Sequence, residues 1–225
     1  MKLAILGMAA SVLWAQPEGR LDLRVRDDFF AGMFGDRTRL ERGMTVTEEL
    51  LRKNPRNAQA LVWHGSGLLT RASNAYADGQ SQIGDRQWKQ GLKELDRARE
   101  LAPGDLGVLI GRSAILIGIA QSGFDPTDPQ GRALLTTAVR DYETVLERQS
   151  GYLAKLSEHS RCELLFGLAA GWNRLDEISK TRGYLERIVE HCAGSPYEAE
   201  ARRYLEKSPM PVIDHNCIGC HVSKK

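Results

Sequence analysis

The sequence predicts an all-α fold in which antiparallel helical hairpins stack into a solenoid. Apolar residues recur at spacings of three and four along most of the chain, whereas the alternation typical of strands is scarce. One set of small and large residues also recurs at a nearly constant interval, which is typical of proteins built from repeated units. Together these patterns indicate helix pairs that share a core with their neighbours.

The bulk composition is that of an ordinary globular protein. The chain has 225 residues, of which 42% are hydrophobic and 27% charged. This suffices for one or two small domains with a real core. The net charge of +2 and the scarcity of like-charged blocks give no reason to expect nucleic acid as a partner.

Residues 1–15 have the pattern of a secretory signal peptide, with Met1-Lys2 followed by the apolar run Leu3–Ala15 and then the polar stretch "QPEGR". The run is shorter than the roughly 20 residues of a transmembrane helix. A buried N-terminal helix is the alternative. No cysteine adjoins the break, so a lipid anchor is not expected, and no other segment is apolar enough to span a membrane. The sequence therefore predicts an exported protein, periplasmic or extracellular, without a membrane span after signal cleavage.

A repeated pattern marks the second helix of each predicted hairpin. Its copies begin at Gly43, Gly91, Ala138 and Thr181, at intervals of 48, 47 and 43 residues. The copies are Gly43, Thr47, Leu50 and Pro55; Gly91, Leu95, Ala98 and Pro103; Ala138, Tyr142, Val145 and Ser150; and Thr181, Leu185, Ile188 and Ala193. The first two copies close on proline, which stops a helix.

This pattern resembles the second helix of a tetratricopeptide repeat (TPR), and "LVWHGSGLL" and "ELLFGLAAG" resemble its first helix. The resemblance covers roughly residues 25–207 and implies a solenoid of antiparallel helix pairs. The usual unit has about 34 residues, so the spacing here is longer. The excess lies in "SNAYADGQSQIGDRQ" and "QSGFDPTDPQGR", which are predicted to be long turns within the hairpins.

The solenoid is predicted to end in the helix "SPYEAEARRYLEK", with Ser195 as cap and Pro196 in its first turn. The following "SPMPVIDHN" is predicted to be a non-helical linker, because its prolines forbid a helix. The domain organisation is thus a signal peptide at 1–15, a TPR-like domain at 16–207 and a tail at 208–225.

The tail carries Cys217-Ile218-Gly219-Cys220-His221, which resembles the haem-attachment motif of c-type cytochromes. Two thiols at this spacing reach the two vinyl groups of one haem, and His221 can then bind the iron as axial ligand. Three alternatives stay open. They are a thioredoxin-like dithiol, a Cys217–Cys220 disulfide, and a zinc site formed by the cysteines with His215 and His221.

A sixth iron ligand must come from upstream or from a partner, because only four residues follow His221. Met210 and His215 are the nearest candidates. His64 and His159 lie in the repeat region and are predicted to be packing residues. An open or partner-completed sixth position is favoured.

Cys162 and Cys192 lie symmetrically about the predicted turn "NRLDE" near residue 177. Residues placed in this way face each other in an antiparallel helix pair, so a disulfide between them is favoured. Two buried free thiols are the alternative.

The chain shows no catalytic signature. The sequence predicts an exported cytochrome with one covalent haem c on a TPR-like scaffold, which transfers electrons to an envelope redox protein or docks with it through the haem. The first alternative is a TPR-like protein-binding adaptor whose tail binds zinc or forms a disulfide. The second is a haem protein that reacts with a small ligand or peroxide.

Overall fold

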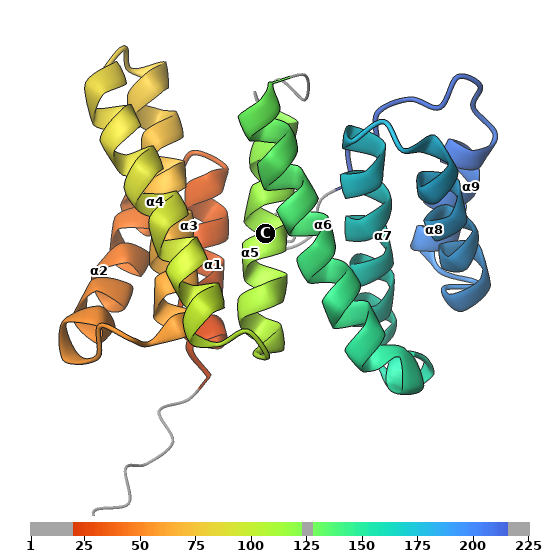
Figure 1. Ribbon diagram of the computed structural model, residues 1–225, viewed down its shortest axis with the longest axis horizontal. Helices are drawn as coiled ribbons and strands as arrows, with labels where there is room; N and C mark the ends of the chain where they lie inside the picture. The colour runs from red at the N-terminus through yellow and green to blue at the C-terminus, as the bar shows by residue number, and fades with distance from the viewer. Residues whose placement is uncertain (1–19, 123–127, 216–225) are drawn as a thin grey trace, which may run out of the picture.

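The computed structural model describes residues 20–122 and 128–215 (Figure 1). Within these ranges the chain forms nine α-helices and one short 3-10 helix, and no strand. Consecutive helices pack as antiparallel pairs that lie side by side along the long axis of the molecule. The predicted all-α hairpin solenoid is therefore confirmed.

Four hairpins and a closing helix make up this architecture. The first two hairpins are α1 (Leu21–Met33) with α2 (Arg37–Lys53), and α3 (Ala58–Ala77) with α4 (Ser81–Leu101). The next two are α5 (Leu106–Ser122) with α6 (Pro129–Gln149), and α7 (Glu158–Arg174) with α8 (Ile178–His191). The 3-10 helix η1 (Ser150–Lys155) connects α6 to α7, and α9 (Pro196–Leu205) packs on α8.

Local sequence explains where the helices begin and end. Asp36, Asn57, Asp128, Ser157 and Ser195 each accept a hydrogen bond from a backbone N–H in the first turn of the helix that follows. Such caps satisfy donors that have no partner inside the helix. The predicted closing helix with its Ser195 cap is thereby confirmed.

The repeated positions form the contact faces of the second helices. At the second position of the pattern, Thr47, Leu95, Tyr142 and Leu185 are 0%, 1%, 3% and 0% exposed. At the third, Ala98, Val145 and Ile188 are fully buried. Two apolar clusters result, a smaller one over α1–α3 and a larger one from α3 to the end of the described chain. The spacing of the repeated pattern thus predicts which face of each second helix is buried in the core.

The long turn predicted at residues 73–87 is wrong. The helices continue to Ala77 and from Ser81, and only three residues, with Gly79 at φ +73°, connect them. The Tyr76 ring lies over Gly84, where a Cβ would come within 2.6 Å of it, and its hydroxyl donates to Asp85. This cross-helix contact extends a hairpin whose Gly and Ser content indicated a loop. In the second predicted turn, α5 runs to Ser122 and α6 starts at Pro129, and residues 123–127 lie outside the described ranges.

Two glycines allow α3 and α4 to approach closely. A Cβ at Gly91 would lie 2.8 Å from the Gly65 carbonyl oxygen, and a Cβ at Gly65 would lie 2.9 Å from the Gly91 carbonyl oxygen. Backbone atoms inside two packed helices cannot move aside as a flexible side chain can. Both positions therefore require glycine for packing.

We expect Gly91→Ala to lower the free energy of unfolding by about 1–3 kcal/mol, because the two helices must separate to admit the methyl group. Gly183→Ala on α8 is the matched control, since a Cβ there meets no atom within 4 Å. This control should gain about 0.5–1 kcal/mol from helix propensity. Urea unfolding followed by circular dichroism measures both, and equal stability of the two variants would contradict the close-approach argument.

No helix in the described part of the chain is long and apolar enough to cross a membrane. The predicted signal peptide at residues 1–15 lies outside the described residues.

Candidate functional site

The structure describes only part of the predicted site. Cys217, Cys220 and His221 lie outside the described residues, which end at His215. The two other cysteines, Met210 and His215 are described, and all of them lie on the last hairpin or on the segment that follows α9.

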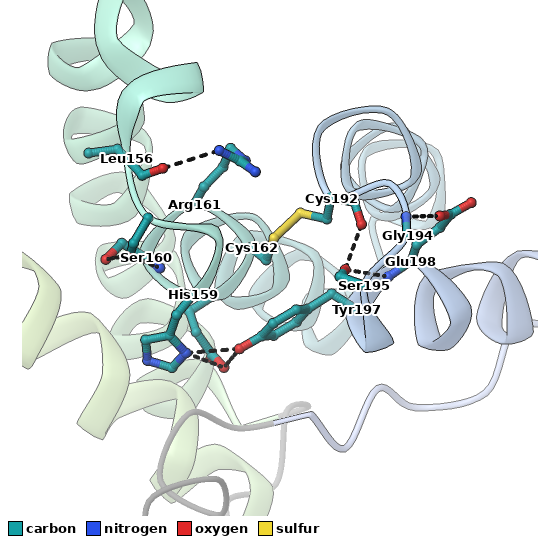
Figure 2. The surroundings of a disulfide bond; sticks show 12 residues. Leu156, His159, Ser160, Arg161, Cys162, Cys192, Gly194, Ser195, Tyr197 and Glu198 are labelled. Atoms are coloured by element: carbon teal, nitrogen blue, oxygen red, sulfur yellow. Dashed lines mark hydrogen bonds and ion pairs between the residues drawn. A yellow bond between two sulfur atoms is a disulfide. The ribbon is translucent and has the colours of Figure 1, made fainter.

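Cys162 and Cys192 are joined by a disulfide, with their Cα atoms 6.1 Å apart. The bond connects the second turn of α7 to the C-cap of α8, so it closes the end of the hairpin opposite the turn (Figure 2). Both cysteines are buried, at 0% and 1% exposed. The connection between α7 and α8 lies at residues 175–177, where the sequence placed it. The disulfide braces the hairpin that carries the tail.

The same end of the hairpin orients α9. The Ser195 hydroxyl donates to the Cys192 carbonyl at 2.5 Å and accepts from the Glu198 amide at 3.3 Å. The Gly194 amide donates to the Glu198 carboxylate at 2.7 Å, and this bond lowers the pKa of Glu198 (Figure 2). The start of α9 is therefore tied to the disulfide by consecutive hydrogen bonds.

The segment after α9 is docked on the scaffold rather than free. Ile213 is fully buried, and its amide donates to the Asn173 side-chain carbonyl at 2.8 Å. The Asn173 side-chain amide donates in turn to the Pro211 carbonyl at 3.3 Å. The sequence predicted a non-helical linker here, and residues 208–215 are indeed non-helical. They are nevertheless bound to the end of α7, a contact that the linker prediction missed.

Tyr204 and Asp214 form a second attachment of this segment. The Tyr204 hydroxyl donates to the Asp214 carboxylate, and the Asp214 amide donates back to the same hydroxyl at 3.3 Å. Burial and the hydrogen bond to Asp214 raise the pKa of Tyr204 to about 12, so the hydroxyl keeps its proton at physiological pH. Met210 is partly buried and packs against the larger apolar cluster.

Among the described residues of the tail, His215 is an enclosed titratable group. Its side chain is 8% exposed and its ring stacks on Phe166, with centroids 4.1 Å apart. Nδ1 lies 3.0 Å from the Glu200 carboxylate and Nε2 lies 3.3 Å from the Glu163 carboxylate. Burial lowers the pKa of His215, but the hydrogen bonds and charges of Glu163 and Glu200 outweigh burial and raise the pKa to about 9. Both ring nitrogens therefore face carboxylates.

A second histidine adjoins this cluster. The Tyr197 hydroxyl donates to Glu163 Oε1 at 2.9 Å and lies 2.9 Å from His159 Nδ1. Figure 2 shows His159 and Tyr197 pointing toward each other from α7 and α9. The His159 side chain is 48% exposed, in contrast to His215. Glu163 therefore connects two imidazoles, and sequence analysis missed it because its partners come from three separate segments.

The cluster around Glu163 contains two imidazoles, those of His159 and His215, and His215 lies two residues in sequence before Cys217. Imidazole and thioether side chains are the ligands that haem iron takes from proteins. Within the described residues, no group of three or more His, Cys, Asp or Glu is arranged to hold a metal ion. The zinc alternative of the sequence analysis involves residues outside the described ranges.

No protein-family model, no curated protein and no solved structure matches the chain. Fold and site together define an all-α helical-hairpin protein with a disulfide-braced last hairpin, on which the described residues 208–215 are docked.

Proposed function

We propose that this protein is an exported c-type cytochrome with one haem, held on a TPR-like helical scaffold, which exchanges electrons with an envelope redox protein. The observation that carries the proposal is the motif Cys217-x-x-Cys220-His221, which follows the docked segment 208–215 in the sequence. When bound, the haem supplies one-electron transfer, with thioethers at the two cysteines and His221 on the iron.

Two features support export. The first residues have the signal-peptide pattern. The Cys162–Cys192 disulfide is of the kind that persists in oxidising compartments and is rare in the cytosol. Export would therefore place the protein in a compartment that suits both the disulfide and covalent attachment of haem to cysteines.

The scaffold supports the partner role. The repeated positions of the TPR-like pattern are buried on α4, α6 and α8, and on α2 Gly43 and Thr47 are buried whereas Leu50 is partly buried. Such hairpin solenoids present extended surfaces on which other proteins bind. This part of the proposal rests on analogy of fold, and the chemistry rests on the tail.

The first experiment is expression of the full-length protein in a host that exports it and attaches haem. We expect haem staining on a denaturing gel and an intact mass that exceeds the polypeptide by one haem. Cys217→Ala/Cys220→Ala should abolish both signals. The matched control is Cys162→Ala/Cys192→Ala, which removes the other cysteine pair and should keep the haem.

Zinc or a tail disulfide in place of haem would overturn the electron-transfer proposal and favour the adaptor function. Rapid turnover of peroxide by the haem-loaded protein would instead favour the ligand-reactive alternative.

A further inference from the structure

We propose that a groove along α4, which extends to the start of α6, is a docking site for an acidic segment of a partner protein. The groove has a volume of about 920 Å³ and is open to solvent rather than enclosed. It lies on second helices of the hairpins, not on the helices that carry the disulfide and the docked segment 208–215. The inference goes beyond the proposed function, because it concerns the scaffold alone and does not require haem.

One end of the groove is formed by the part of the second hairpin that exceeds the usual TPR unit. α3 continues to Ala77 and α4 begins at Ser81, and this end of the hairpin projects beyond α1 and α2 (Figure 1). Tyr76 and Asp85, on either side of the short turn, both line the groove. The stretch that the sequence predicted to be a loop therefore supplies part of its wall.

A single face of α4 forms the length of the groove. The lining residues of this helix recur at spacings of three and four, so they share one side of it. Glu100, the last of them, follows Asp85 by 15 residues. At a rise of about 1.5 Å per residue, this corresponds to roughly 22 Å, the length of about four helical turns or about seven extended residues. An open groove of this length suits a chain segment, whereas small-molecule sites bury most of their ligand.

An apolar floor gives a partner area to cover. Trp88 and Leu92, one helical turn apart, line the groove and are partly buried against the larger apolar cluster. Tyr76 is 41% exposed, and its hydroxyl donates to Asp85 at 2.9 Å. Aromatic side chains are enriched where proteins bind one another, because they bury a large area at a low cost in conformational entropy.

The carboxylates that line the groove already accept hydrogen bonds from within the protein. The pairs are Asp85 with Tyr76, Asp96 with Arg112, and Glu100 with Arg97, at 2.9, 2.6 and 2.9 Å. These negative charges are therefore engaged before a partner arrives.

Two lysines of the groove are in the opposite situation. Lys89 and Lys93 lie one turn apart on the lining face and are exposed, and neither forms an ion pair within the described part of the chain. Carboxylates of a partner can pair with them, and such complementarity gives specificity and speeds association. The charges that remain available in the groove thus favour an acidic segment.

The carboxylates of the groove also separate a peptide from a membrane as the occupant. They flank the two lysines along α4, so a uniformly negative surface, such as an anionic bilayer, would meet like charges there. A peptide can instead place single carboxylates beside the lysines and apolar side chains over the floor. This arrangement favours a protein segment that carries both kinds of residue.

The test selects peptides from a random library displayed on phage, with the full-length protein as the target. We expect the enriched peptides to combine acidic with apolar residues. Synthetic copies should bind the wild type in a fluorescence anisotropy titration and bind Lys89→Glu/Lys93→Glu about tenfold more weakly or worse, because each reversed charge repels a carboxylate of the peptide. Added salt should weaken binding to the wild type, since the pairs are exposed.

Lys155→Glu/Lys207→Glu is the matched control, because it makes the same change of charge at two exposed lysines outside the groove. This control should bind as the wild type does, and so should Lys89→Arg/Lys93→Arg, which keeps the charge. Circular dichroism of each variant verifies that it is folded. Haem staining of the same preparations tests the proposed function separately.

Failure to enrich any peptide would overturn the inference, as would enriched peptides without an acidic bias. Equal binding to Lys89→Glu/Lys93→Glu and to the control would place the peptide elsewhere on the protein. Binding to vesicles of phosphatidylglycerol and phosphatidylcholine that is lost in Lys89→Glu/Lys93→Glu, without peptide enrichment, would assign the groove to a membrane surface instead.

Discussion

Replacing Asp141 with alanine is expected to lower the free energy of unfolding by about 3–5 kcal/mol. Asp141 on α6 is 1% exposed and accepts from Arg112 of α5 at 2.6 Å and from Arg99 of α4 at 2.9 Å. Without it, the Arg112 guanidinium stays buried with one charge partner fewer. Its Nε atom already lacks a hydrogen-bond partner among the described residues. Urea unfolding followed by circular dichroism measures the loss.

Asp96→Ala provides the comparison, because Asp96 binds the same guanidinium at 2.6 Å from the exposed side, with its side chain 62% exposed. An ion pair with an exposed partner contributes at most about 1 kcal/mol. A loss of similar size in both variants would show that burial does not determine the effect. The Asp141 network is where α4, α5 and α6 meet, so the variant also tests how the second and third hairpins are coupled.

Removal of the disulfide by Cys162→Ala/Cys192→Ala is expected to lower the free energy of unfolding by about 3–4 kcal/mol. The cysteines are 30 residues apart, and a loop of this size loses that much entropy in the unfolded chain when it is closed. The measurement is urea unfolding of the wild type and the variant, each with and without a reductant.

Reductant during unfolding should lower the stability of the wild type to that of the variant and leave the variant unchanged. Unequal endpoints would indicate that the alanines alter the packing at two buried positions in addition to removing the bond. A wild type whose intact mass already shows free thiols at both cysteines would contradict the disulfide itself.

The hairpin architecture could be predicted because it depends on the spacing of residues that are close in the sequence. The second position of the repeated pattern, such as Leu95 or Leu185, lies on the buried face of its helix. Its spacing from the first position can be read from the sequence without knowing which helix packs against it. The Cys162–Cys192 bond was predictable for a similar reason, because residues at equal distances from a turn lie opposite each other in an antiparallel helix pair.

The extent of the second hairpin was not predictable from composition. Gly84 and Ser81 indicated a loop, whereas both lie within α4, and the Tyr76 ring occupies the space that a Cβ at Gly84 would need. A glycine in a turn and a glycine at a close contact look alike until the neighbouring helix is known.

The docking of residues 208–215 could not be predicted from local sequence patterns either. Its contacts come from Glu163 and Asn173 on α7 and from Tyr204 on α9, which have no spacing in common. The sequence offers Met210, Val212 and Ile213 as apolar residues of this segment, and only the structure shows that Ile213 is fully buried whereas Val212 is exposed.

The docking of Ile213 and His215 bears on how fast and how tightly a partner could engage the tail. Fixing one residue of a flexible chain costs about 1–2 kcal/mol of conformational entropy. For residues 211–215 this cost is met when the protein folds, and none of it is deducted from the affinity of a later encounter. A protein that binds residues 211–215 would therefore meet a segment that is already ordered on the scaffold. Short-lived complexes, in which contact must form and dissolve quickly, gain most from such preorganisation.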